Sequence, residues 1–207
     1  MTLLTKSKYV HGLTCPRFLW MEVHQKDKLP EVDKVTQHRF DQGHLVGELA
    51  KKCFPKGIDL AGLEFKENID KTKKAVKERK VIFEAGIMFK NLYSRADVLV
   101  PVGKDEWDIV EVKSSTQVKE EHLHDLSFQR FTYEQAGLNI RHCVLIHINN
   151  QFMKKGKINS QEFFVQENIT KEVDEVAKGI EERIEAMLKL IASPTFSEKI
   201  AGGCTQP

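Results

Sequence analysis

The spacing of hydrophobic residues has the period of β-strands in the middle of the chain and the period of helices on either side. Five segments predict strands, the last of them an edge strand: residues 81–89, 96–102, 107–113, 142–148 and 162–165. Gly103, Lys104 and Asp105 have the composition of a turn between the second and third strands. We therefore expect these two strands to form a hairpin.

Helical periodicity predicts four helices, over residues 33–53, 71–80, 118–138 and 170–191, and Pro16 suits the first turn of an earlier one. Asn68 is a candidate cap for the helix at 71–80, and Thr170 for the last helix. The apolar stripe of the helix at 33–53 consists of Val35, Phe40, Val46, Leu49, Ala50 and Cys53. The order of elements predicts the α/β class, with a mixed central β-sheet flanked by helices.

Composition is that of a globular domain with a core of its own. The chain has 207 residues, of which 41% are hydrophobic and 30% charged, and its net charge is +2. This charge is too small to indicate a nucleic-acid binder by itself, so affinity for DNA has to come from local basic patches. No stretch approaches the roughly 20 apolar residues that cross a bilayer, and residues 1–10 lack a signal core. We expect no membrane partner and a cytoplasmic location.

One candidate catalytic group lies on the second and third predicted strands. Glu111 and Lys113 are two residues apart, so their side chains project from the same face of a strand. A hairpin through Gly103 brings Asp97 beside Glu111. Two carboxylates together suit Mg²⁺ or Mn²⁺, which can activate a water at a phosphate, and Lys113 can stabilise the developing charge.

Taken alone, a Glu-x-Lys match is most often a surface ion pair. The apolar neighbours of Asp97 and Glu111 place these two carboxylates in buried strands instead, where they need a partner or a metal. Gln129 and Tyr133 are one helical turn apart and can position a phosphate or a base. His44, in the first long helix, is a candidate imidazole ligand, although a lone helical histidine is more often structural.

This ordered set resembles the RecB-like branch of the PD-(D/E)XK nuclease superfamily, which includes CRISPR-associated adaptation nucleases. The resemblance extends from about Tyr9 to Cys204 and includes the opening Leu13-Thr14-Cys15-Pro16-Arg17. It implies a restriction-endonuclease-like core over residues 1–207. The resemblance assigns the metal ligands to His44, Asp97, Glu111 and the carbonyl of Val112. It assigns the catalytic residues to Asp97, Glu111, Lys113, Gln129 and Tyr133. The residue before Asp97 is Ala96 where the family motif has proline.

Other polar residues allow both a functional and a structural interpretation. Glu84 is either an additional acidic ligand or, as we favour, a plain strand-end carboxylate. His122, His124 and Asp125 are interpreted as the solvated start of a helix rather than a metal cluster, because Asp125 lies off the side that the two histidines share. The basic run at residues 71–80 is a solvated face that can also contact phosphates.

The resemblance also implies a 4Fe–4S cluster, held by one N-terminal and three C-terminal cysteines. Cys15 and Cys204 match two of these positions, and no further cysteine follows Cys204. We therefore expect either a piece of a longer protein, cut before the end of a cysteine-rich segment, or the loss of the cluster. Cys53 and Cys143 lie on apolar faces and are expected to be buried as small hydrophobic side chains.

Three functions remain open from the sequence. The first is a metal-dependent deoxyribonuclease, with an exonuclease acting on DNA ends or single strands favoured, in repair or CRISPR adaptation. The second is a catalytically silent DNA-binding module with the same fold. The third is a structural subunit that serves other repair or CRISPR-adaptation proteins. An intact set of Asp97, Glu111 and Lys113 favours the first, because binding alone needs no buried acidic site.

Overall fold

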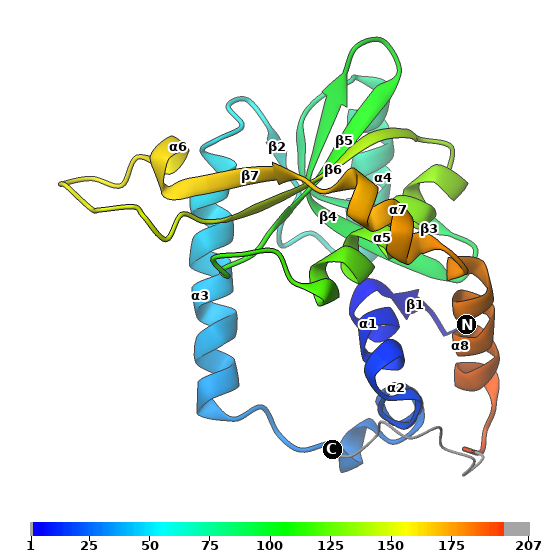
Figure 1. Cartoon of the computed structure of the whole chain (residues 1–207). Coiled ribbons are helices and arrows are strands. Elements are labelled where there is room, and N and C mark those ends of the chain that lie inside the picture. Colours follow the sequence, from blue (N-terminus) through cyan, green and yellow to red (C-terminus); the bar gives the residue numbers. More distant parts are fainter. Residues whose placement is uncertain (1, 197–207) are drawn as a thin grey trace.

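A curled mixed sheet with helices on both faces forms the body of the protein (Figure 1). The computed structural model describes residues 2–196. Its helices are α1 (Lys6–Thr14), α2 (Pro16–His24), η1 (Lys26–Lys28), α3 (Lys34–Lys51), α4 (Phe65–Lys77), α5 (Glu120–Gln135), α6 (Ser160–Phe163), α7 (Thr170–Ala177) and α8 (Ile180–Ala192). Its strands are β1 (Leu4–Thr5), β2 (Ile58–Asp59), β3 (Ile82–Phe89), β4 (Leu92–Val102), β5 (Glu106–Val112), β6 (Asn139–Ile148) and β7 (Phe164–Asn168).

Six strands follow the order β2-β3-β4-β5-β6-β7, and β1 pairs with β4 beside this path. Strands β3, β4 and β5 are antiparallel neighbours, as are β6 and β7, while β5 and β6 are parallel. Helix α5 makes the crossover between the two parallel strands, which a tight turn cannot join. The predicted α/β class with a mixed sheet between helices is confirmed.

Three apolar clusters hold these layers together. The first packs α4, α5 and α7 against the sheet, and the third packs the C-terminal half of α3 on Phe83, Val98 and Val110. The second joins the two ends of the chain, because Leu4, Tyr9 and Leu19 pack with residues of α8. Figure 1 shows α1 and α2 beside α8, below the sheet. No helix among residues 2–196 has the length and apolar character needed to span a bilayer.

Several predicted boundaries were wrong. Helix α4 begins at Phe65, so Asn68 lies inside it rather than at its cap, and its buried amide donates to the carbonyls of Leu60 and Glu84 at 3.1 and 2.9 Å. Strand β4 begins at Leu92, which places Asp97 in its interior.

The helix predicted over residues 170–191 is interrupted. Helix α7 ends at Ala177, and Gly179, with φ +71°, precedes α8. A periodic apolar stripe continues through the break, and for that reason the sequence pattern predicted one helix.

Candidate active site

The hairpin of β4 and β5 places the predicted carboxylates side by side. Its register pairs Val98 with Val110, which brings Asp97 next to Glu111. The backbone N–H of Val112 donates to Oδ2 of Asp97 at 2.7 Å, and this bond fixes the Asp97 side chain against β5. Glu111 is almost fully buried, with 1% of its surface exposed. Gly103, with φ +53°, permits the reversal that connects the two strands.

Glu111 is the centre of a buried ion-pair network. Its Oε1 accepts from the ammonium groups of both Lys113 and Lys6, each at 2.8 Å. Its Oε2 accepts from the amide Nε2 of Gln129 at 2.7 Å. A carboxylate offers about four lone-pair positions, so three donors occupy most of its capacity. Glu111 is therefore held in one orientation.

Asp125, from α5, provides the second anion of this network. Its Oδ2 lies 2.7 Å from Nζ of Lys113, and its Oδ1 lies 3.7 Å from Nζ of Lys6. With 6% of its surface exposed, Asp125 is buried, and so is His122 at 4%. The prediction of a solvated helix start at these residues was wrong, because this turn of α5 packs against α1 and Lys113.

The charges in the network shift one another's pKa values. Burial, together with the neighbouring charge of Glu111, raises the pKa of Asp97 to about 7. Burial acts in the same direction on Glu111, but the ammonium groups of Lys113 and Lys6 outweigh it and hold the pKa of this carboxyl well below its usual range. For Lys113, burial favours the neutral form, yet Glu111 and Asp125 raise its pKa. Lys113 is therefore a cation at neutral pH and acts as a proton donor in hydrogen bonds, not as a base.

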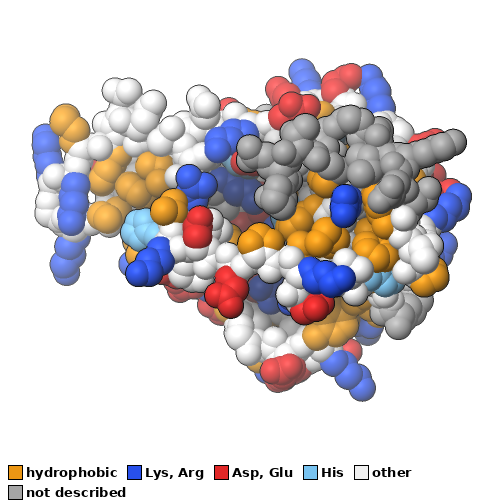
Figure 2. All heavy atoms as spheres, turned by 90° about the horizontal axis from the view of Figure 1, so that it is seen from below, with side chains coloured by type: hydrophobic (Ala, Val, Ile, Leu, Met, Phe, Trp, Pro, Cys, Tyr) orange, Lys and Arg blue, Asp and Glu red, His pale blue; other side chains and the backbone are white. Residues whose placement is uncertain are grey.

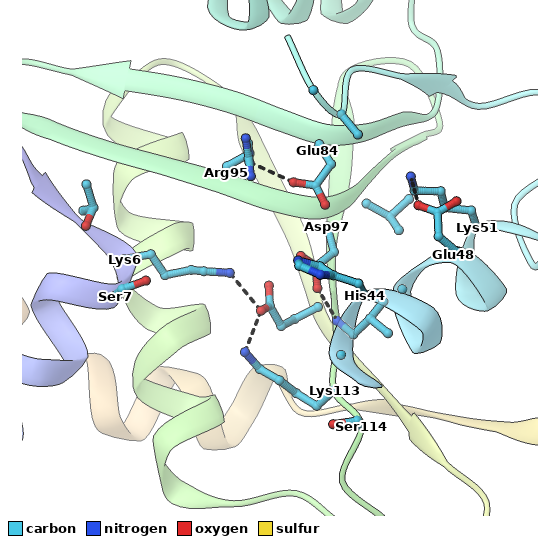
Figure 3. A pocket seen from close by; sticks show the side chains of 18 of the residues that line it. Lys6, Ser7, His44, Glu48, Lys51, Glu84, Arg95, Asp97, Lys113 and Ser114 are labelled. Carbon is cyan, nitrogen blue, oxygen red and sulfur yellow. Dashed lines mark hydrogen bonds and ion pairs between the residues drawn. The ribbon is translucent and has the colours of Figure 1, made fainter. Parts of the chain in front are cut away.

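A cavity of about 830 Å³ opens over these residues. Asp97, Glu111, Val112 and Lys113 line it from the sheet, and His44 lines it from α3 (Figure 3). Seen from the side of α2, the molecular surface has a hollow in which Lys or Arg side chains lie deep (Figure 2). The cavity thus presents the cationic side chains of Lys6 and Lys113 beside the carboxylates of Asp97 and Glu111.

Glu84 lies inside β3 and also lines this cavity, so it is not a strand-end residue. Its backbone adopts a left-handed conformation, with φ +56°. Its carboxylate pairs with Nε of Arg95 at 2.8 Å (Figure 3). Glu84, the additional acidic ligand considered from the sequence, therefore already forms an ion pair with Arg95.

Gln129 and Tyr133 act from behind the cavity. Both side chains have 0% exposed surface. Gln129 holds Glu111, while the hydroxyl of Tyr133 donates to the carbonyl of Ala85 and accepts from the N–H of Ala96 at 3.0 Å. The expected role of this pair in positioning a phosphate or a base stays a prediction, and neither residue is among those that line the cavity. The pair ties α5 to the two strands that carry the acids.

The donor set suits a hard divalent cation in its chemistry, because two carboxylates and the Val112 carbonyl belong to residues that line one cavity. Burial, and after it the charge of Glu111, raises the pKa of Asp97, and a cation bound beside it would favour the charged carboxylate again. However, residues 2–196 contain no group of three or more His, Cys, Asp or Glu side chains arranged to hold a metal. His44, Asp97 and Glu111 thus line one cavity without forming a completed ligand cluster.

The three described cysteines, Cys15, Cys53 and Cys143, differ in burial. Cys15 is buried at the start of α2, where its Sγ accepts from the N–H of Phe18 at 3.4 Å, whereas Cys204 lies outside the described residues. Cys143 has 0% exposed surface, and burial raises the pKa of its thiol to about 12. Cys53 is half-buried against the apolar cluster under α3. Burial was predicted for both of these cysteines, and it is complete only for Cys143.

Comparison with solved structures identifies the fold as that of a nuclease. Over 92% of this chain and 88% of the other, the structure is similar to the alkaline exonuclease LHK-Exo of Laribacter hongkongensis, with a TM-score of 0.53 and 13% sequence identity. LHK-Exo in complex with dAMP aligns with a TM-score of 0.45 and 12% identity, over 91% of each chain. The structure of SSO0001 aligns with a TM-score of 0.43 and 12% identity, over 89% of this chain and 76% of the other. At TM-scores below 0.5, these last two likenesses carry no further conclusion.

Sequence comparison adds nothing to this likeness, since no protein-family profile and no curated protein sequence matches the chain. The likeness to LHK-Exo, at low identity, establishes the fold. The chemistry of this chain has to be argued from its own residues.

Two site residues were missed by sequence reasoning. Lys6 is 105 residues from Glu111 in sequence and reaches it only because β1 pairs with β4, which places the start of α1 beside the acids. Asp125 was noticed but interpreted as solvent-exposed. Its spacing of four residues before Gln129 was the available signal, because that spacing places both side chains on one face of α5.

Proposed function

We propose that this protein is a metal-dependent deoxyribonuclease. The observation that carries the proposal is that Asp97, Glu111 and Lys113 line one cavity, with Glu111 almost fully buried and the other two half-buried, on a fold similar to that of an alkaline exonuclease. Glu111 loses its hydration on burial, and a buried carboxylate costs free energy unless cations or hydrogen-bond donors compensate it. Phosphodiester hydrolysis makes use of all three groups.

Each residue has a role that follows from its contacts. Asp97, fixed by the Val112 N–H, and Glu111, fixed by Gln129, present oxygen atoms to a divalent cation. Bound Mg²⁺ or Mn²⁺ would supply Lewis-acid stabilisation of the phosphate and an acidified water. Lys113 donates hydrogen bonds to a non-bridging phosphate oxygen as negative charge builds up there. His44 is the residue on α3 that we assign to the same cation from across the cavity.

More specifically, we assign the chain to the RecB-like branch of the PD-(D/E)XK nucleases, acting as an exonuclease on DNA ends or single strands. The order His44, Asp97, Glu111, Lys113 and Gln129 supports this assignment. Repair or CRISPR adaptation in the cytoplasm is the setting that we propose, with proteins of those pathways as partners. A 4Fe–4S cluster involving Cys15 and Cys204 belongs to the proposal only for a longer chain.

The test is cleavage of end-labelled linear DNA, single- and double-stranded, with Mn²⁺ or Mg²⁺ and with EDTA. We expect degradation that requires the metal, and a loss of about 100-fold or more in rate for Lys113→Met, the size of effect seen when one transition-state donor is removed. Lys189→Met is the matched control, because Lys189 is an exposed lysine paired with Glu185 on α8. Closed circular DNA in parallel separates exonuclease from endonuclease action.

DNA binding by fluorescence anisotropy distinguishes the alternatives. Protein that binds DNA but cleaves none of these substrates with either metal is a silent binding module, and the nuclease proposal then fails. Protein that neither binds nor cleaves DNA fits a structural subunit. An equal loss of activity in Lys189→Met and Lys113→Met would mean that the loss follows from removing any positive charge, and not from the role of Lys113 in the site.

A further inference from the structure

Lys6 occupies the place where a cation is expected. Its ammonium group lies 2.8 Å from Oε1 of Glu111 and 3.7 Å from Oδ1 of Asp125, and Asp97 adds to the negative potential there. The lysine comes from the first turn of α1, far from the strands in sequence. It lines the large cavity beside the carboxylates, where Figure 3 shows it pointing at the same side chain as Lys113.

The two lysines on Glu111 differ in how firmly they are held. Lys113 has a second short contact, at 2.7 Å to Oδ2 of Asp125, whereas the second acid near Lys6 is 3.7 Å away. Both lysines border another cavity, of about 240 Å³, whose lining includes the acids Glu121 and Asp125, so the difference between them rests on the second short contact of Lys113. An ammonium group released from Glu111 thus finds space and opposite charge on its other side. Of the two, Lys6 is the lysine that can leave.

We propose that Lys6 is a positioning residue that acts as the built-in counter-cation of this site, holding Glu111 in the metal-free protein and competing with a divalent cation for its carboxylate. The inference rests on the proposed metal-dependent function. It explains why the acids share a cavity while residues 2–196 contain no assembled cluster of three ligands. Lys6 would release Glu111 to a bound divalent cation by turning toward Asp125 and Glu121, and it would return to Glu111 in the absence of the cation.

The test measures metal affinity, not activity. Mn²⁺ binding is followed by the EPR signal of free Mn²⁺ at fixed pH and ionic strength, for wild type, Lys6→Met, Lys6→Arg and Lys8→Met. Lys6→Met removes the competitor, so we expect Mn²⁺ to bind about 10-fold more tightly or better, within the range of couplings between linked sites. Lys6→Arg keeps the charge and should bind Mn²⁺ as wild type does. Lys8→Met removes a charge whose ammonium contacts the Leu3 carbonyl at 3.2 Å, and it should leave affinity unchanged.

Two additional measurements locate the effect. In a Glu111→Gln background the gain from Lys6→Met should disappear, because the contested carboxylate is gone. In wild-type protein, added Mg²⁺ should shift the ¹⁵Nζ resonance of Lys6 more than that of Lys113. This second measurement needs no substitution to fold, so it tests the proposal even if Lys6→Met is unstable.

The outcomes separate the two proposals. Clear Mn²⁺ binding that Lys6→Met leaves unchanged or weakens, or a Lys6 resonance that Mg²⁺ does not move, would overturn the role of Lys6 and leave the nuclease proposal standing. Absence of binding in both wild type and Lys6→Met would overturn the metal dependence itself, and the role of Lys6 with it.

Discussion

At the scale of single residues, Asp125 allows two ammonium groups to lie beside one glutamate. Lys113 and Lys6 both contact Oε1 of Glu111, and without a further anion they would repel each other in a buried place. Asp125 lies 2.7 Å from one ammonium group and 3.7 Å from the other. Replacing Asp125 by a neutral residue would leave a partly buried ammonium group without a negative partner. The resulting loss in the free energy of unfolding is far larger than the loss from breaking a surface ion pair.

We therefore expect Asp125→Asn to lower the free energy of unfolding by about 3 kcal/mol, the low end for breaking a buried pair, because Lys113 keeps 28% of its side chain exposed. Urea unfolding at neutral pH measures this change. The matched control is Asp174→Asn, which breaks an exposed pair with Arg130 and should cost less than about 1 kcal/mol. Similar losses in the two variants would show that the network contributes no more than a surface ion pair.

His122 makes stability depend on pH. Burial and the charge of Lys113 lower its pKa to about 4 from an ordinary value of 6.5. The unfolded chain therefore binds a proton at higher pH than the folded chain does. The contribution of His122 to stability is complete above pH 6.5 and is lost as the pH falls through about 4.

An NMR titration of the His122 ring should accordingly show no protonation between pH 8 and pH 5. In unfolding experiments, His122→Asn should reduce the loss of stability between pH 6.5 and pH 4. An observed midpoint near 6.5 for this ring would contradict the prediction.

At the scale of elements, the sequence predicts best where a short turn joins two neighbouring strands. The turn at Gly103 predicted a hairpin that places Asp97 beside Glu111, and the register of β4 and β5 confirms it. The stripe of α3 was less reliable. Val46 and Ala50 are buried, but Val35 is 61% exposed and Phe40 51% exposed, since the first half of the helix extends past the sheet (Figure 1). Hydrophobic spacing indicates which residues share a face, and not how far the neighbouring layer reaches.

Two glycines in helical regions should respond oppositely to alanine. Gly179 joins α7 to α8 with φ +71°, a conformation in which a Cβ is strained, so Gly179→Ala should destabilise the protein by about 1–2 kcal/mol. Gly43 is inside α3, and a Cβ there meets no atom within 4 Å, so Gly43→Ala should stabilise it by up to about 1 kcal/mol. Thermal unfolding of both variants measures the difference. A change in stability of the same sign in both variants would contradict this prediction.

At the scale of the whole molecule, the two ends of the chain form the support that positions Lys6. Leu19, with 0% exposed surface, packs in the cluster that joins α1 and α2 to α8. Trp20 Nε1 donates to the carbonyl of Ser193 at 2.9 Å, and Nε of Arg183 donates to the hydroxyl of Tyr9 at 3.0 Å. The sequence did not predict this arrangement, because each contact joins residues more than 170 positions apart.

Because the cluster of α1, α2 and α8 is buried, we expect substitution of Leu19 to affect stability far more than substitution of the exposed Leu45. Leu19→Ala leaves a cavity in the cluster between the chain ends and should cost about 2–5 kcal/mol, whereas Leu45→Ala, at a position 59% exposed on α3, should change stability by less than about 0.5 kcal/mol. Because α1 depends on this cluster, Leu19→Ala should also speed amide hydrogen exchange in α1 more than in β4 and β5. Urea unfolding and hydrogen exchange measure the two effects. If exchange became faster to the same extent in the sheet and in α1, the cluster around Leu19 would not stabilise α1 in particular. Lys6 would then be positioned only by its contacts with the acidic residues.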